Sequence, residues 1–348
     1  MPINLSIALK IIKLLNSSIS HFILASLFIV SISTKAQVVN VGGVIENDRI
    51  FYEDTTYVVV QNLIIPKNKS LTIRPGTVVK INFGRNIIVD NGSLYAIGDQ
   101  VDSVYFLSNY TEPGQIWKWN GLQIKNSDYE NPSILQYLKV VNAETAIMIE
   151  NSINVQVENT SITGSQNVGI NITNSSFCYI VNCTIKNNYN GIEIYTGDGG
   201  LTANNIVTNS FLKNENHNIN IFVEQNGKYV NNQLNNNKIS QGNNGIWIDN
   251  GGNTINYGNS ITKNIIINNG GDIGFGLFLA HDSIIVSNNI FWNNNTAIYT
   301  AERGRYCGIL NNSFYKNRWA LAVGSGSVGN NILNNTFSEN IQETISIK

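Results

Sequence analysis

The 348-residue chain has few charged residues, few prolines and few cysteines, and these shortages exclude several classes of protein. Only 13% of its residues are charged and the net charge is −1, so it has neither the basic field of a nucleic-acid-binding protein nor an acidic tail. Three cysteines are an odd number and too few for a disulfide scaffold. Three histidines, one of them His21 near the N-terminus, do not supply a structural zinc site. We therefore predict no metal site and no cofactor, and no pattern indicates bound calcium.

Asparagine and isoleucine are, by contrast, very frequent: the chain contains 59 Asn and 51 Ile, nearly a third of its length. Both residue types are middling or poor helix formers, so a mainly helical protein is excluded. The hydrophobic fraction of 42% is normal and the net charge is small, which argues against intrinsic disorder.

Residues 1–36 have the pattern of an export signal. Lys10 and Lys13 precede an apolar run from Phe22 to Ile32, and small or polar residues lead to a cleavage site before Gln37. The alternative is a retained membrane anchor, but the run is much shorter than the ~20 residues that a spanning helix needs. We predict a signal peptide over 1–36, no membrane span after its removal, and secretion to the periplasm, the cell surface or the medium.

A four-residue phrase, small-Ile-x-Ile, recurs along the rest of the chain. Copies begin at residues 121, 146, 169, 191, 218, 245, 276, 297, 320 and 344, so their mean spacing is (344 − 121)/9, close to 25 residues. A second phrase, Asn-Asn-x-Phe/Ile-x-x-Asn, precedes most copies by six or seven residues. Both phrases alternate with period two, which predicts short strands joined by Asn and Gly turns, with no room for a helix.

This pattern resembles the right-handed parallel β-helix proteins of the pectin-lyase-like superfamily. Leucine-rich repeats share the period but need Leu at fixed positions and a helical return segment. The segment Leu71–Lys80 also resembles the L-T-I-x-P-G-T-x-V phrase of secreted bacterial β-helix domains. The resemblance implies an all-β solenoid of about 12 coils of roughly 25 residues, with entry coils over 37–120 and repeats over 121–348. It also implies that Asn side chains stack inside the turns.

Asn289, Asn312 and Asn335 each lie two residues before an inward Phe, so we expect them to point inward as such a ladder. Cys183 occupies the equivalent place in an earlier coil, which predicts a buried thiol. Cys178 and Cys307 lie five coils apart and should not form a disulfide.

The outward positions of the small-Ile-x-Ile strands carry many aromatic residues in the middle coils. The coils starting at 191, 218 and 245 are also longer than the others, and an insertion lies around Asn268–Asp272. Aromatic faces stack on sugar rings, so we predict a polysaccharide- or glycan-binding groove here; the alternative is an aromatic ladder that only packs on itself. The binding candidates are Tyr195, Phe222, Trp247, Asp249, Phe278, Tyr299 and Arg305.

Catalysis has weaker support. Glu193 and Asp249 lie two coils apart, roughly 10 Å along the axis, a spacing that suits an inverting but not a retaining glycosidase. His281 and Arg303 are further candidates for acid–base chemistry. The N-T-D, D-D and G-H-G phrases of polygalacturonases and the Asp-Pro-Asp-His phrase of alginate epimerases do not occur.

We therefore predict a glycan-binding protein rather than an enzyme. A polysaccharide lyase or glycoside hydrolase that uses the same groove, and a non-catalytic structural or adhesion protein, remain alternatives. Residues 344–348 start a new rung without a polar cap. This edge predicts a protein partner, self-stacking on another copy, or a truncated chain.

Overall fold

Short strands joined by tight turns form the described part of the chain, which contains no helix and hence none able to cross a membrane. The computed structural model describes residues 37–109, 111–112, 115–116, 118–271, 273–342 and 344–347. The predicted signal peptide lies outside these residues, as does Asp272 of the insertion.

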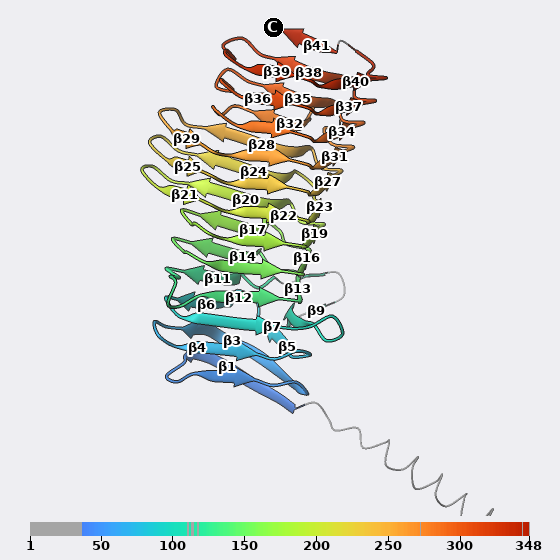
Figure 1. Ribbon diagram of the computed structural model, residues 1–348. Coiled ribbons are helices and arrows are strands. Elements are labelled where there is room, and N and C mark those ends of the chain that lie inside the picture. The colour runs from blue at the N-terminus through green and yellow to red at the C-terminus, as the bar shows by residue number, and fades with distance from the viewer. Residues whose placement is uncertain are drawn as a thin grey trace, which may run out of the picture. The chain divides into compact units, whose positions relative to one another are not determined.

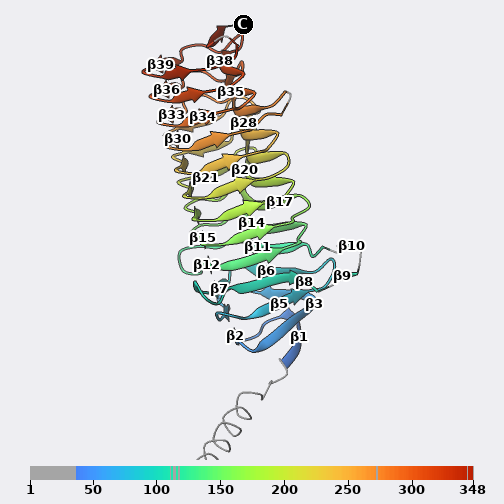
Figure 2. The same ribbon diagram turned by 90° about the vertical axis from the view of Figure 1, so that its right-hand side faces the viewer.

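The strands wind into a right-handed parallel β-helix of about 12 turns with about 24 residues per turn, as predicted (Figures 1 and 2). Each turn passes through three parallel sheets. Sheet 1 contains β1 (Gln37–Val44), β3 (Thr55–Ile65), β6 (Asn86–Asp90), β11 (Gly121–Lys125), β14 (Thr145–Glu150), β17 (Val168–Thr173), β20 (Asn190–Thr196), β24 (His217–Val223), β28 (Asn244–Asn250), β32 (Phe275–Leu279), β35 (Thr296–Thr300), β38 (Trp319–Val323) and β41 (Ile345–Ile347).

Sheet 2 contains β2 (Arg49–Phe51), β4 (Ser70–Ile73), β7 (Ser93–Ile97), β12 (Ser133–Gln136), β15 (Val155–Glu158), β18 (Tyr179–Val181), β22 (Ile206–Thr208), β26 (Gln233–Asn235), β30 (Ser260–Thr262), β33 (Ile285–Ser287), β36 (Gly308–Leu310) and β39 (Asn331–Leu333). Sheet 3 contains β5 (Val78–Ile81), β8 (Val104–Ser108), β13 (Leu138–Val141), β16 (Ser161–Thr163), β19 (Thr184–Lys186), β23 (Phe211–Lys213), β27 (Lys238–Ser240), β31 (Ile265–Ile267), β34 (Ile290–Trp292), β37 (Ser313–Tyr315) and β40 (Thr336–Ser338). Sheets 1 and 3 meet at β3, which pairs with both β5 and β6. A small antiparallel hairpin joins β9 (Thr111–Glu112) and β10 (Gln115–Ile116).

The core is built from the inward residues of the repeated phrases, as the period-two alternation predicts. Ile219 pairs in register with Ile246, and Ile246 with Leu277, and none of the three side chains is exposed. The inward Phe291 and Phe314 of sheet 3 stack at 5.2 Å with nearly parallel rings. Like side chains therefore lie above one another along the axis, so each coil buries its apolar face against the next.

The two residues of each Asn-Asn pair in the second phrase have different structural roles. The first Asn adopts the left-handed backbone conformation that turns the chain: among the described residues, 21 of the 30 non-glycine residues with positive φ are Asn. Asn288, with φ of 58°, is one example. The second, Asn289, is 1% exposed and points inward. The frequent asparagine thus serves both the turn surface and the interior.

The predicted ladder through Asn289, Asn312 and Asn335 is confirmed. Nδ2 of Asn289 donates to Oδ1 of Asn312 at 3.0 Å, and Nδ2 of Asn312 donates to Oδ1 of Asn335 at 3.1 Å. Further ladders connect Asn205 with Asn232 and Asn259, and Asn269 with Asn294, Asn317 and Asn340. All three cysteines are buried and unpaired, as predicted, and Cys183 donates its sulfur proton to backbone carbonyls.

The three long coils form an additional sheet at one corner of the solenoid. Their extra residues make β21 (Leu201–Ala203), β25 (Lys228–Val230) and β29 (Ile255–Tyr257), which pair in parallel and project to the left in Figure 1. The next coils turn directly from sheet 1 to sheet 2, so the additional sheet ends after β29 in a step.

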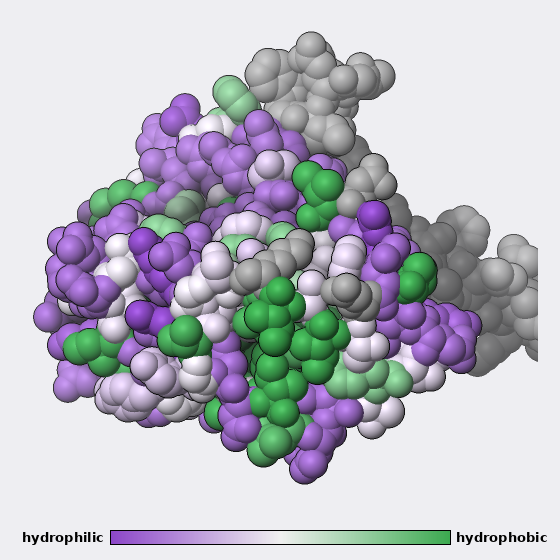
Figure 3. Space-filling view, turned by 90° about the horizontal axis from the view of Figure 1, so that it is seen from above, coloured by the Kyte–Doolittle hydropathy of each residue, from purple (hydrophilic) through white to green (hydrophobic). Residues whose placement is uncertain are grey.

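The end of the solenoid that carries β41 exposes part of its apolar interior. Seen along the axis from this end, hydrophobic side chains occupy the centre of the face (Figure 3). The exposed hydrophobic residues of the last turns include Leu333, Ile341, Ile345 and Ile347.

Candidate functional site

The outward side chains of sheet 1 form two columns along the axis. In the first column, Asn220 pairs in register with Trp247, Trp247 with Phe278, and Phe278 with Tyr299. In the second, Tyr195 pairs with Phe222, and Phe222 with Asp249. The register thus brings the sequence-predicted aromatic residues onto one face, but in two separate columns.

Within the first column the aromatic rings pack on each other. The ring centroids of Trp247 and Phe278 lie 3.8 Å apart with an interplanar angle of 7°, and Tyr299 follows at 5.7 Å from Phe278. Since Trp247 and Phe278 cover each other's faces, no sugar ring can stack between them. Trp247 and Phe278 therefore form an aromatic ladder. They do not present these stacked faces to a groove.

Trp247 is also the last ring of this stack, and its other side is different. On the preceding coil it adjoins Asn220, a short polar residue, and His217, whose ring lies 5.5 Å away and is tilted by 55°. Among the described residues, no parallel ring covers this side. Burial lowers the pKa of His217, and Nδ2 of Asn244 lies 3.2 Å from its Nδ1.

A cavity of about 720 Å³ opens beside Trp247. The lining residues that the structure describes present a mainly apolar surface and include no carboxylate. The lining residues are Asn216, Asn243, Asn244, Trp247, Gly270, Ile273, Gly274 and Phe275. Its volume lies within the range of small-ligand sites, which are concave and mostly apolar with a few polar groups. We call it the tryptophan cavity.

The insertion between β31 and β32 forms one wall of the tryptophan cavity. At its tip Ile273 is 88% exposed. Gly274 lies so close to the neighbouring coil that a Cβ would stand 1.9 Å from the carbonyl oxygen of Asn243, so only glycine fits there. The backbone N–H of Phe275 donates to Oδ1 of Asn244 at 2.9 Å, which fixes Phe275 beside Trp247. The insertion is therefore anchored at its base and carries an apolar side chain at its tip.

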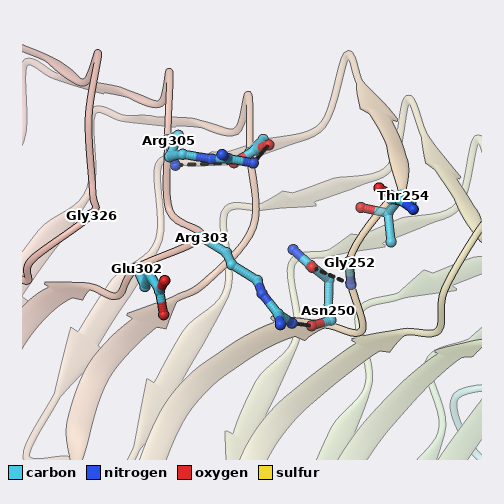
Figure 4. A pocket seen from close by; sticks show the side chains of 9 residues that line it. Asn250, Gly252, Thr254, Glu302, Arg303, Arg305 and Gly326 are labelled. Atoms are coloured by element: carbon cyan, nitrogen blue, oxygen red, sulfur yellow. Dashed lines mark hydrogen bonds and ion pairs between the residues drawn. The ribbon is translucent and has the colours of Figure 1, made fainter.

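A second cavity, of about 400 Å³, lies at the other end of β28, in the step where the additional sheet ends. Its lining is polar and charged (Figure 4). The lining residues are Asn250, Gly252, Asn253, Thr254, Asp282, Glu302, Arg303, Arg305 and Gly326. We call it the arginine cavity.

Two arginines in the arginine cavity are held in different ways. Arg305 donates through Nε and Nη2 to the two carboxylate oxygens of Asp282, at 3.1 and 2.9 Å. This pairing raises the pKa of Arg305. Arg303 instead donates through Nη1 to the backbone carbonyl of Asn250, a neutral partner (Figure 4). The positive charge of Arg303 is thus oriented by the fold without being neutralised by that partner.

The other sequence-predicted candidates line neither cavity. Glu193 accepts a hydrogen bond from Asn190 at 2.7 Å, and Asp249 accepts one from the backbone N–H of Asn250 at 2.8 Å. Tyr195 donates a short hydrogen bond to Glu224, which raises the pKa of Tyr195. Its ring and that of Phe222 stack at 6.2 Å.

His281 lies in the interior, whereas its role as a candidate for acid–base chemistry requires an accessible side chain. It is fully buried, and neither ring nitrogen has a hydrogen-bond partner. Burial lowers its pKa to about 4, although the nearby Asp282 raises it in part. A general acid or base must reach its substrate, so a side chain in this position is not a candidate for that role.

Several residues that line the cavities, and His217 beside Trp247, are absent from the sequence-based candidates. His217, Ile273 and Phe275 stand outside the small-Ile-x-Ile phrase, where alternation assigns no face. Asn253 and Thr254 belong to the turn after β28. The length of the inserted segments was the one signal in the sequence that pointed to these positions.

Comparison with solved structures supports the fold. The chain resembles a double mutant of the periplasmic alginate epimerase AlgG with a TM-score of 0.55 and 11% identity, over 84% of this chain and 78% of that one. It resembles the Dettilon tailspike protein with a TM-score of 0.51 and 14% identity, over 89% and 61% of the two chains. It also resembles the N-terminal fragment of gene product 12 of bacteriophage Phi29, with a TM-score of 0.50 and 14% identity, over 84% and 63%. At such identities the likeness shows the fold alone.

No curated protein sequence matches the chain. A family profile does: NosD, described as periplasmic copper-binding protein, matches residues 99–306, which is more than half of the chain.

The described side chains that could bind copper do not fit a copper site. Copper in proteins is held by His, Cys and Met ligands. Burial raises the pKa of the Cys178 and Cys183 thiols to about 12, which keeps them protonated. His217 and His281 lie two coils apart, and in the described part of the chain no three His, Cys, Asp or Glu side chains gather closely enough to hold a metal ion. The match in sequence and the parallel solenoid nevertheless agree, and the chain belongs to the NosD family.

Proposed function

We propose that this protein is exported and binds a polysaccharide or glycan, with Trp247 as the principal contact in the tryptophan cavity. The observation that carries the proposal is the Trp247 ring, which lines a mainly apolar cavity of about 720 Å³. A sugar ring has an apolar face and a polar rim. The aromatic and aliphatic walls complement the first, and the amides of Asn216, Asn243 and Asn244 complement the second.

Binding is favoured over catalysis because none of the described residues that line the tryptophan cavity carries a carboxylate, and glycoside hydrolysis uses a pair of carboxylates. The two sequence-predicted acids, Glu193 and Asp249, make separate hydrogen bonds on different coils. Export is supported by the signal pattern of residues 1–36 and by the description of the family as periplasmic.

Affinity gel electrophoresis tests this function. The purified protein is run through native gels that contain xylan, β-glucan, mannan, polygalacturonate or alginate, and retardation reports binding. Trp247→Ala should weaken binding by about 2 kcal/mol, or roughly 30-fold, as expected for an aromatic residue at the centre of a binding site.

Trp292→Ala is the matched control. Trp292 is a half-exposed tryptophan on sheet 3 and lines neither cavity, so its removal should leave retardation unchanged. Equal binding by the wild type and Trp247→Ala would refute the role of the cavity. Reducing ends or unsaturated products released from the same polymers would show an enzyme instead.

A further inference from the structure

The arginine cavity has a chemistry that the proposed function does not use. Its walls come from consecutive coils, because the turn after β28 protrudes beyond the coils that follow it. Asn253 and Thr254 supply an amide and a hydroxyl from the protruding turn, and Glu302 and Arg303 line the cavity from a later coil. Figure 4 shows Thr254 on one side of the cavity and Arg303 and Glu302 on the other. The step in the solenoid thus brings four kinds of hydrogen-bonding group to one concave surface.

The charges of this cavity balance. Its lining contains Asp282, Glu302, Arg303 and Arg305, two acids and two bases. Asp282 and Arg305 neutralise each other in a bidentate ion pair. Three ion pairs occur in the described part of the chain, and neither Glu302 nor Arg303 takes part in any of them. A carboxylate and a guanidinium therefore remain available, with no excess charge of either sign.

From this balance we infer that the arginine cavity binds a neutral sugar unit of the same glycan, an inference that rests on the proposed function. Each sugar hydroxyl both donates and accepts a hydrogen bond. Neighbouring hydroxyls can therefore donate to Glu302 and accept from Arg303, and charged partners make these bonds stronger than neutral ones. The carboxylate of an acidic sugar would be attracted by Arg303, but repulsion by Glu302 would cancel a comparable amount of binding energy. The pair consequently selects neutral sugars over uronates.

The position of the two cavities fits one ligand. Strand β28 borders both: Trp247 lines the first cavity and Asn250 the second. Three residues of extended chain span about 10 Å, approximately the length of a disaccharide. A short segment of glycan lying along β28, across the solenoid axis, would reach from the tryptophan ring to Arg303.

The test compares neutral and acidic polymers in the same affinity gels. The wild type should be retarded by a neutral polymer among xylan, β-glucan and mannan, and much less by polygalacturonate or alginate. Arg303→Gln should weaken neutral binding about tenfold, the effect expected for loss of one hydrogen bond from a charged group. Glu302→Gln should also weaken neutral binding, and should strengthen binding to polygalacturonate about fivefold because a like charge is removed. Glu130→Gln, an exposed acid between β11 and β12, is the control.

The outcomes separate the inference from the proposed function. If the wild type binds an acidic polymer as tightly as any neutral one, or if neither variant changes neutral binding, the inference is overturned. The proposed function would still stand in that case, provided that Trp247→Ala weakens binding roughly 30-fold, as predicted above. Absence of retardation by every polymer would overturn both.

Discussion

Replacing Asn289 by alanine should strongly destabilise the solenoid, and the hydrogen bonds of the ladder give the magnitude. Oδ1 of Asn289 accepts from the backbone N–H and from Nδ2 of Asn264, at 2.9 and 3.0 Å. Its Nδ2 donates to the carbonyl of Ile261 at 2.9 Å and to Oδ1 of Asn312 at 3.0 Å. One amide therefore serves four partners in the two adjacent coils.

Alanine would leave three of these buried groups without their partner: the N–H and one amide hydrogen of Asn264, and the carbonyl of Ile261. Oδ1 of Asn312 would keep the bond from the backbone N–H of residue 289, at 3.0 Å. A buried polar group that loses its partner costs about 1–3 kcal/mol. Partial relaxation of the neighbouring coils should keep the total cost of the three groups near the lower end of its range. We therefore expect Asn289→Ala to lower the free energy of unfolding by about 4 kcal/mol.

The adjacent Asn288 provides the control. It has a φ of 58° and an exposed amide whose nearest partner is Ser287 Oγ at 3.4 Å. Asn288→Ala loses no buried bond and carries only the cost of alanine in the left-handed region, about 1–2 kcal/mol. Urea unfolding followed by tryptophan fluorescence measures both variants, and the midpoint should shift with the slope unchanged. If Asn289→Ala is no less stable than Asn288→Ala, the ladder does not carry the stability assigned to it.

Two other predictions concern side chains that the repeat does not require. The pKa of His281 is lowered to about 4 by burial, against 6.5 unfolded, so its contribution to stability is full above pH 6.5 and is lost as pH falls towards 4. The wild type should therefore lose about 3 kcal/mol more than His281→Asn between pH 7 and 4, measured by urea unfolding; equal losses would contradict a buried neutral imidazole. Asn218→Ala should cost about 4 kcal/mol by the same reasoning, because three buried groups would lose their partner: the N–H and one amide hydrogen of Asn214, and the carbonyl of Ser240. Nδ2 of Asn218 also donates to Oδ1 of Asn269 at 3.2 Å, which bridges the ladder at Gly242, a residue without a side-chain amide. The outward Asn220→Ala should cost little, and equal thermal midpoints for these two variants would refute this role.

The sequence predicted the solenoid well because its repeat is enforced by packing in every coil. The inward positions of Ile246 and Asn289 follow from period-two alternation, and the ladder that Asn289 joins follows from the resemblance to β-helix proteins; both residues are buried as expected. Asn218 shows the limit of this reasoning. It stands at the small position of its phrase, yet its side chain reaches Asn269 two coils away to replace an amide missing at Gly242. Such compensation depends on contacts between coils, which a single repeat does not encode.

The candidate site was less predictable because alternation assigns a face to a side chain but not an orientation to a ring. It placed Trp247 and Phe278 on the outside, but a groove and a ladder are equally consistent with that placement. The burial of His281 was not predictable either. It follows Ala280 at the corner after sheet 1, where strand periodicity no longer applies, and its ring packs against Tyr229 of the additional sheet at 6.2 Å.

The two interpretations of the aromatic column are compatible when Trp247 is considered at the end of its stack. Phe278 covers one side of the indole at 3.8 Å, which restricts the rotation of the ring, and the same ring lines the tryptophan cavity. A ring that is held before the ligand arrives loses little conformational entropy on binding. The ladder therefore supplies rigidity and the cavity supplies the contact. The same division fits the first column, in which aromatic residues follow Trp247 and a polar residue, Asn220, precedes it, so that the stack of parallel rings ends at Trp247.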